Sequence, residues 1–259
     1  MTISISILGS GWLGLPLAQH FVEKGYTVNA STRTPCRQAE IAATGAQPFI
    51  VDIAQLNAHT DDFLNADVLI INITSKSLQD FASLVARIQS SPIKYVLLIS
   101  STSVYRDIAR VMTEADTEHL ADTPLLAIER AVQSLAGKGV TVVRMSGLIG
   151  GRRHPGNFFR NGKAIANPDA PVNLIHLDDC LGIIDAVVTQ GAWGEIFNGT
   201  ADSHPSRRDF YSYAAGQLER EPLVMGENEA GIGKEVSNAK VKAVLGYECI
   251  HPDLMALTF

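Results

Sequence analysis

The sequence predicts an α/β fold in which helices cover both faces of a parallel sheet. Three observations carry this prediction. Short apolar segments recur along the first 150 residues, segments of helical periodicity separate them, and the first strand runs directly into Gly9-Ser10-Gly11-Trp12-Leu13-Gly14. Ligands of such sheets bind at the carboxyl ends of the strands. We therefore expect the functional residues in the loops that follow the strands.

The elements follow one another in a regular order. Apolar or alternating segments predict strands at 3–8, 26–31, 47–51, 66–73, 94–100 and 139–145. One helix follows the glycine-rich turn, and a second is expected at 78–88. Beyond the aperiodic segment 147–171, we expect strands at 172–177 and 195–198 and helices at 178–188, 206–218 and 238–245.

This pattern predicts one structural unit with two parts. Residues 1–150 form the sheet-bearing core, and residues 151–259 form a mixed part. Within the mixed part, residues 172–198 are expected to complete the sheet. Residues 151–171 and 199–259 are expected to form a small C-terminal lobe on the substrate side.

The composition narrows the class of protein. Its 259 residues are 46% hydrophobic and carry a net charge of −6, so no basic surface for nucleic acid or an anionic membrane is expected. Three widely separated cysteines form no CxxC pair, and no histidine cluster has metal-site spacing, so neither disulfides nor a metal is predicted. We find no signal peptide or membrane span and expect a cytoplasmic protein with small-molecule partners.

The glycine-rich turn indicates dinucleotide binding in a Rossmann-type, doubly wound sheet. Gly9 allows the tight turn, Gly11 allows a pyrophosphate to approach the backbone, and Gly14 allows the helix to pack on the sheet. The helix N-terminus adds N–H donors and a positive dipole end. All six residues of the turn are therefore candidate cofactor contacts. The alternative is a turn that only joins a strand to a helix.

The residues after the second and third strands bear on which cofactor binds. The second strand ends at Ser31-Thr32-Arg33, where an acidic residue would accept from the ribose 2′-hydroxyl of NAD. The hydroxyls of Ser31 and Thr32 and the guanidinium of Arg33 are suited to a 2′-phosphate, which favours NADP over NAD, unless Arg33 is a solvated loop residue. Asp52, followed by Ile53, suits an adenine contact or, alternatively, a strand-end cap.

Three later segments resemble the extended short-chain dehydrogenase/reductases, the nucleotide-sugar epimerase and dehydratase family. They are 100–105 (SSTSVY), 144–150 (RMSGLIG) and 173–179 (NLIHLDD). The resemblance covers most of the chain and implies an NAD(P) cofactor and, by analogy with relatives, a homodimer. It also implies cofactor contacts near the nicotinamide at Ser100, Gly147, Leu148 and Ile149.

The catalytic residues of that family are matched only in part. Ser101 corresponds to the serine that steadies the reacting oxygen, but no YxxxK motif occurs at any of the six tyrosines. The proton donor would then be Tyr105, His154 or a water, with Arg106 or Arg110 lowering the pKa of Tyr105. The alternative for Tyr105 is a structural role.

Candidate substrate contacts follow the last core strand. Paired arginines and an asparagine in one loop could hold a phosphate or carboxylate, although a solvated basic loop is equally compatible. The candidate substrate-binding residues are Arg152, Arg153, Asn157, Asn173 and His176. His176 also suits a structural role, bonded to a backbone group or Asp179. The expected function is an atypical reductase or epimerase acting on a phosphorylated or nucleotide-linked molecule; a non-catalytic NADP(H) sensor is the alternative, and a fold without cofactor ranks last.

Overall fold

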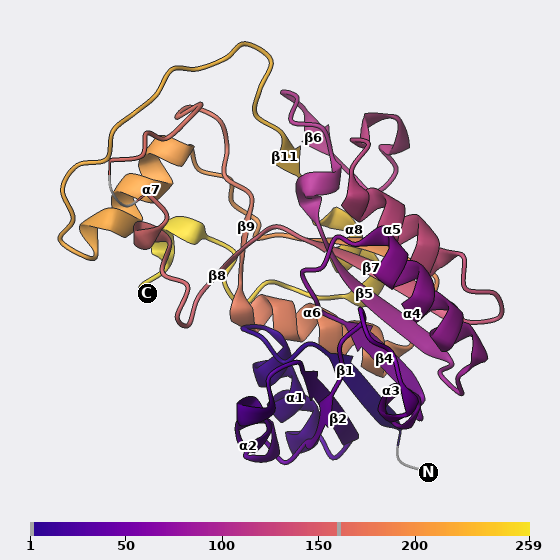
Figure 1. Cartoon of the computed structure of the whole chain (residues 1–259). Helices are drawn as coiled ribbons and strands as arrows, with labels where there is room; N and C mark the ends of the chain where they lie inside the picture. The colour runs from indigo at the N-terminus through magenta and orange to yellow at the C-terminus, as the bar shows by residue number, and fades with distance from the viewer. Residues whose placement is uncertain (1–2, 160–161) are drawn as a thin grey trace. The chain divides into compact units, whose positions relative to one another are not determined.

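A parallel sheet is the central element of the structure. The structure, a computed structural model, describes residues 3–159 and 162–259, and within them seven strands form the main sheet (Figure 1). β1 pairs in parallel with both β2 and β4, so the winding direction reverses at β1. In spatial order the strands are β3 (Gln47–Ile50), β2 (Thr27–Thr32), β1 (Ser4–Leu8), β4 (Val68–Ile71), β5 (Tyr95–Ser101), β7 (Gly139–Met145) and β10 (Ile196–Gly199).

Helices alternate with these strands along the chain. They are α1 (Gly14–Glu23), α2 (Gln38–Ala42), α3 (Ala58–Phe63), α4 (Leu78–Ser90), α5 (Pro124–Gln133) and α6 (Leu177–Gln190). Hydroxyl caps define two of the starts, because Ser77 Oγ accepts from the Asp80 amide at α4 and Thr123 Oγ1 accepts from the Leu126 amide at α5.

The sheet is buried on both faces. Leu69 and Ile71 of β4 pack in one core cluster with Phe81 of α4 and Ile128 of α5. The intervening Ile70 is also fully buried. Because successive side chains of a strand point to opposite faces, this burial requires cover on both sides and explains the continuous apolar strands of the sequence.

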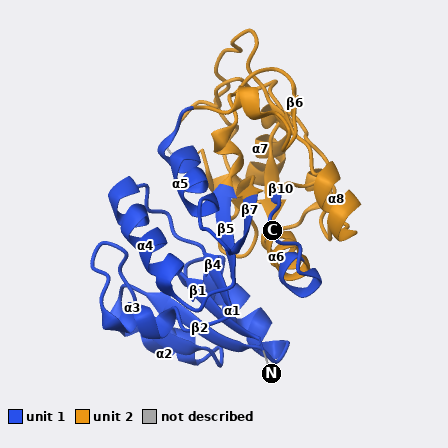
Figure 2. Cartoon of the chain, turned by 90° about the vertical axis from the view of Figure 1, so that its right-hand side faces the viewer, with its two compact units in different colours: residues 1–100, 122–143, 187–196 blue, residues 101–121, 144–186, 197–259 orange. Residues whose placement is uncertain are grey.

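The chain divides into two compact units (Figure 2). Unit 1 comprises residues 1–100, 122–143 and 187–196, and unit 2 comprises residues 101–121, 144–186 and 197–259. Unit 2 contains two short parallel ladders, β6 (Val111–Met112) with β11 (Glu235–Val236) and β8 (Gly147–Ile149) with β9 (Leu174–His176). It also contains α7 (Arg207–Gly216) and α8 (Ala239–Leu245), with Phe210 and Leu254 in its core.

The expected α/β fold with a doubly wound parallel sheet is confirmed, and most predicted elements lie within two residues of the observed ones. One placement differs. The strand predicted at 172–177 is β9, which pairs with β8 because the Gly147 amide donates to the Asn173 carbonyl, so residues 172–198 extend the main sheet only through β10.

The division of the chain at residue 150 and the substrate-side lobe stay predictions. Residues 160 and 161 of the expected lobe lie outside the described residues. In the part of the chain that the structure describes, no helix has the length and apolarity needed to cross a membrane.

Candidate functional site

A cavity of about 470 Å³ lies within unit 1 at the carboxyl ends of β1 to β4. This is the edge at which the winding direction of the sheet reverses, where ligands of such sheets bind. Seven predicted cofactor contacts line the cavity together: Gly9, Ser10, Gly11, Thr32, Arg33, Asp52 and Ile53. The strand-end rule therefore locates the cavity correctly.

The three glycines of the turn differ in what surrounds them. A Cβ at Gly9, which has a φ of +100°, would lie 2.4 Å from the Asn72 carbonyl oxygen, and one at Gly14 would lie 1.9 Å from the Gly9 carbonyl oxygen. A Cβ at Gly11 would meet no heavy atom within 4 Å. The fold itself requires Gly9 and Gly14, whereas the open space at Gly11 is compatible with a ligand close to the backbone.

Two side chains hold this turn: Ser31, which the sequence analysis considered only at the end of the second strand, and Asn72, which it did not name. Ser31 Oγ, at the end of β2, accepts a hydrogen bond from the Gly9 amide at 3.0 Å. Asn72, directly after β4, donates from Nδ2 to the Gly9 carbonyl at 3.2 Å. Each of these residues stands at or just after the end of a strand. Their hydrogen bonds, however, join residues that are 22 and 63 positions apart, and no local pattern in the sequence predicts such bonds.

The start of α1 fits a phosphate group. Ser10 is buried, and its Oγ has no hydrogen-bond partner among the described residues although it lines the cavity. Leu13 precedes the helix and provides no side-chain cap. A polar hydroxyl and a helix N-terminus beside open space suit a pyrophosphate, so the residues present fit a dinucleotide.

The end of the cavity at β2 is basic. Arg33 is exposed and makes no ion pair with any residue in the described ranges, while Arg37 also lines the cavity and pairs with Glu40 at 2.8 Å. Thr32 Oγ1 accepts from the Thr34 amide at 3.1 Å. No carboxylate occurs at positions 31–34, the place where a partner for a 2′-hydroxyl is expected.

Asp52 forms the cap that was one of the two roles considered for it, and its contact to adenine stays a prediction. Its Oδ1 accepts from the Ala54 amide at 3.1 Å, which makes it a cap for its own turn, and the residue also lines the cavity. Ile53 is 7% exposed and belongs to the same core cluster as Leu69 and Ile71 of β4. Further residues that line the cavity, and that the sequence analysis did not name, are Thr34, Arg37, Asn72, Thr74, Ser75 and Asp80.

The remaining predicted cofactor contacts lie outside the lining of this cavity. Trp12, Leu13 and Gly14 continue into α1, where Leu13 is buried in the core. Ser100 donates from Oγ to the buried Glu129 carboxylate at 2.5 Å. Gly147, Leu148 and Ile149 form β8 in unit 2. Their contacts to a cofactor stay predictions.

Ser101 and Tyr105 flank one short turn of unit 2. Ser101 Oγ accepts from the Ser103 amide at 3.1 Å. Tyr105 is 2% exposed; its hydroxyl donates to Asn198 Oδ1 and accepts from Arg144 Nη1, both at 2.9 Å. Burial raises the pKa of Tyr105, although the Arg144 charge opposes this shift. A buried tyrosine with both hydrogen bonds made inside the protein is what a structural role for Tyr105 predicts.

The cation beside Tyr105 differs from the two proposed from the sequence. The guanidinium of Arg144 lies 5.0 Å from the centre of the tyrosine ring. Arg110 instead pairs with Asp116 at 3.0 Å. Spacing along the chain favoured Arg106 and Arg110, but Arg144 comes from β7, and the fold brings it to Tyr105 over 39 residues.

His154 packs at the surface of the unit 2 core. Its Nδ1 accepts from the Gly156 amide at 3.1 Å, and its ring lies 4.9 Å from that of Phe259. Nε2 is buried and has no hydrogen-bond partner within the described ranges. Burial, followed by the charge of Arg220, lowers the pKa of His154, so its neutral form is favoured.

The predicted substrate contacts are held in different ways. Arg152 and Arg153 are exposed, and Asn157 Oδ1 accepts from Arg220 at 2.9 Å. Asn173 is committed to the backbone of β11, since Nδ2 donates to the Lys234 carbonyl at 2.9 Å and Oδ1 accepts from the Val236 amide at 2.8 Å. Their contacts to a substrate stay predictions.

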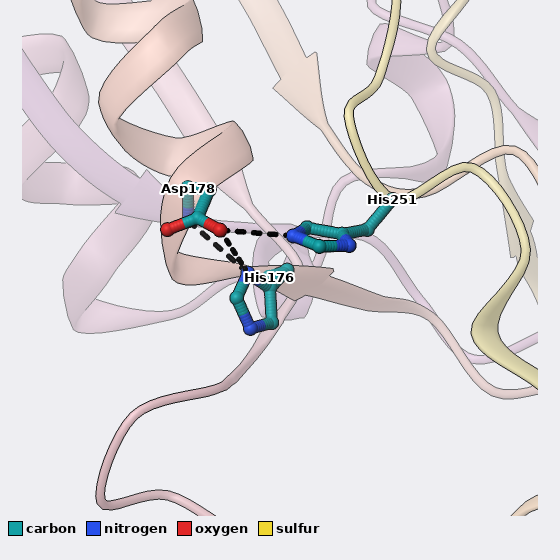
Figure 3. Close-up of side chains that lie close together, drawn as sticks. All are labelled: His176, Asp178 and His251. Atoms are coloured by element: carbon teal, nitrogen blue, oxygen red, sulfur yellow. Dashed lines mark hydrogen bonds and ion pairs between the residues drawn. The ribbon is translucent and has the colours of Figure 1, made fainter. Parts of the chain in front are cut away.

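His176, at the end of β9, faces Asp178 (Figure 3). Its Nδ1 accepts from the Asp178 amide at 3.3 Å and lies 3.2 Å from the Asp178 carboxylate. Burial and then the charge of His251 lower the pKa of His176, against the opposing effect of Asp178. The expected partner Asp179 bonds elsewhere, to Tyr247 and to the amides at 250 and 251.

Known proteins resemble this chain in sequence and in fold. A family model described as the NAD binding domain of 6-phosphogluconate dehydrogenase matches residues 4–125. Protein YeeZ of Escherichia coli K12 is 30% identical over 98% of both chains. A functionally unknown conserved protein from Silicibacter pomeroyi has a TM-score of 0.82 at 20% identity, covering 98% of this chain and 96% of its own. UDP-glucuronic acid 4-epimerase from Bacillus cereus, in complex with NAD, has a TM-score of 0.78 at 16% identity, covering 98% and 95%.

Proposed function

We propose that this chain, which belongs to the family of protein YeeZ, is an atypical extended short-chain dehydrogenase/reductase that uses NADP(H) as its cofactor. Its substrate would be a phosphorylated or nucleotide-linked small molecule. The observation that carries the cofactor proposal is the unpaired Arg33 in a cavity whose β2 end has no carboxylate within the described residues.

Different residues of the cavity would contact different groups of the cofactor. Gly11 and Ser10 would receive the pyrophosphate beside the start of α1, Arg33 the 2′-phosphate, and Asp52 the adenine. Once bound, such a cofactor supplies a hydride donor or acceptor. Arginine suits a phosphate because it presents several N–H donors in a planar fork and stays charged at any physiological pH.

The chemical step would rest on residues of unit 2. Ser101 would orient the reacting oxygen, and the arginine pair at 152 and 153 would hold an anionic substrate group. A similar fold binds NAD in UDP-glucuronic acid 4-epimerase, which supports a nucleotide-linked substrate. Tyr105 and His154 stay the candidate proton donors, with a water as the third. The expected result of testing Ser101→Ala, Tyr105→Phe and His154→Ala is loss of turnover in at least one variant.

Fluorescence titration with NADPH and NADH tests the cofactor proposal directly. We expect NADPH to bind at least tenfold more tightly than NADH, and Arg33→Ala to remove that preference while leaving NADH binding unchanged. Arg130→Ala, which changes an exposed arginine outside the cavity, is the matched control. Tighter binding of NADH would overturn the NADP preference alone, whereas binding of neither would overturn the whole proposal.

A second candidate function is a non-catalytic NADP(H) sensor. The observation that favours it is the environment of Tyr105, whose hydroxyl is already bonded to Asn198 and Arg144 and whose pKa is raised, in a chain without YxxxK. A sensor binds the cofactor and a protein partner in a cofactor-dependent way but transfers no hydride. A screen of nucleotide-linked carbonyl compounds for NADPH oxidation separates the two. The cytoplasmic location and the homodimer stay predictions.

A further inference from the structure

Three donor atoms converge in unit 2 on a site that the sequence did not reveal. His251 Nε2 lies 2.9 Å and His176 Nδ1 lies 3.2 Å from the same oxygen, Oδ2 of Asp178 (Figure 3). All three donor atoms lie within 4.8 Å of one another. The imidazole rings meet edge to face with their centres 4.1 Å apart. Two imidazoles and a carboxylate therefore point into one small volume.

The surrounding structure fixes this arrangement. Asp179, which is fully buried, accepts hydrogen bonds from the amides of Ile250 and His251 at 2.6 and 3.1 Å and from the Tyr247 hydroxyl at 2.9 Å. Asp179 is the neighbour of Asp178 in the chain. Its carboxylate therefore holds the backbone of His251 close to Asp178. The hydrogen bonds of Asp179 thus bring the side chains of Asp178 and His251 together, although Asp179 is not one of the three residues that share the site.

The position of His176 is fixed as well. It ends β9, and in the parallel ladder with β8 it pairs with Ile149. A Cβ on the next residue, Gly150, would lie 2.3 Å from His176 Nε2, so the ring occupies space that only glycine leaves free. The ring therefore rests against the backbone on its Nε2 side and presents Nδ1 toward the carboxylate.

A second cluster of metal-type side chains among the described residues differs because an arginine of the chain already bonds to it. Asp116, Glu118 and His119 also place donor atoms near one another, but the guanidinium of Arg110 bonds to both Asp116 and His119. That cluster already holds a cation from the chain. Within the described ranges, Asp178 forms its ion pairs with the two histidines and none with a lysine or arginine.

We propose that His176, Asp178 and His251 bind a divalent transition-metal ion, with zinc as the best match to the donor set. Zinc accepts imidazole nitrogen and carboxylate oxygen at about 2.0–2.2 Å, which with tetrahedral angles separates the ligand atoms by roughly 3.3 Å. The two distances to Asp178 Oδ2 are 2.9 and 3.2 Å, close to this value. Three protein ligands leave the fourth position to water.

The ion would join two parts of unit 2 that are distant in sequence. His176 and Asp178 stand at the corner between β9 and α6, whereas His251 lies in the C-terminal segment after α8. The hydrogen bonds of Asp179 already connect these parts, and the metal would add a second connection beside them. Bound metal is therefore expected to protect the segment around His251 from proteolysis and from amide exchange.

Cobalt(II) and zinc titrations of the untagged full-length chain, first treated with EDTA, test the proposal. We expect one cobalt ion per chain, visible d–d absorption typical of four ligands, and displacement by zinc. His251→Ala and Asp178→Asn should each weaken binding at least tenfold, and His59→Ala, an exposed histidine of unit 1, should leave it unchanged. We expect both metal-free variants to fold, because the hydrogen bonds of Asp179 remain in each of them. Circular dichroism checks this.

Two results would overturn the proposal. One is the absence of cobalt absorption together with no zinc-dependent protection of the C-terminal segment. The other is binding by His251→Ala and Asp178→Asn with the affinity of the unaltered chain, which would assign the ion to another place. Neither result depends on the cofactor or on turnover, so the metal proposal and the proposed function are tested separately.

Discussion

Substitution of Gly11 by alanine should separate cofactor binding from folding. A Cβ at this position meets no heavy atom within 4 Å, and Gly11 has no positive φ. Its folded conformation therefore accepts alanine, and the free energy of unfolding should stay the same or rise by about 0.4–1 kcal/mol through the smaller entropy of the unfolded chain. The added methyl group instead occupies the open space at the start of α1 where we expect the pyrophosphate.

The loss of affinity can be estimated from the bonds at risk. Displacing the pyrophosphate from one charge-assisted backbone bond costs about 1.5–3 kcal/mol, or roughly ten- to 150-fold in Kd. Fluorescence titration with NADPH measures this loss, and urea unfolding measures stability. Gly216→Ala, another glycine whose Cβ would be free of contacts, is the control. Unchanged NADPH affinity in a folded Gly11→Ala variant would refute the location of the pyrophosphate. Gly14→Ala should instead destabilise the fold, because its Cβ would lie 1.9 Å from the Gly9 oxygen.

Three further substitutions test individual contacts. Ser31→Ala removes the acceptor of the Gly9 amide and should lower the free energy of unfolding by about 1–3 kcal/mol in urea titrations, with weaker NADPH binding. Tyr105→Phe removes the two buried hydrogen bonds that the hydroxyl makes with Asn198 and Arg144 and should lower the free energy of unfolding by a similar amount; a smaller change in urea unfolding would contradict the buried network. The hydrogen bond from Lys94 lowers the pKa of Asp67 to about 2. The ionised Asp67 therefore stabilises the folded protein above about pH 4, and this stabilisation is lost as the pH falls toward 2. Thermal unfolding of Asp67→Asn should therefore differ from that of the unaltered chain at pH 7 and converge with it near pH 2.

The sequence predicts the strands, the glycine turn and the first helix of unit 1 well because their signals are local. A strand, a glycine turn and a helix follow one another within 25 residues, and each has its own periodicity or steric requirement. The rule that ligands bind at strand ends then identifies Arg33 and Asp52 correctly as cavity residues. The same reasoning could have named Thr74 and Ser75, which follow β4, since they too stand at the carboxyl end of a strand.

Contacts between distant segments could not be predicted in this way. Asn72 reaches Gly9 over 63 residues, and His251 reaches Asp178 over 73 residues. Neither pair has a spacing rule, because the sheet order and the path of the C-terminal segment decide which side chains meet. The same limit explains Tyr105, for which chain proximity indicated Arg106 or Arg110 and the fold supplies Arg144.

The proposed cofactor binding and the proposed chemistry rest on residues of different units of the chain. The cavity residues all belong to unit 1, where steric requirements at Gly9 and Gly14 are those of the fold and the open space at Gly11 is compatible with a ligand. The candidate catalytic residues Ser101 and Tyr105 belong to unit 2 and are held by contacts within the protein. Under the proposed function, the cavity binds the cofactor while the Tyr105 hydroxyl is bonded to Asn198 and Arg144, so the chain would use its cofactor without the usual tyrosine and lysine pair. Binding measurements therefore come first, because both an unusual enzyme and a sensor need the cavity that Gly11→Ala would fill.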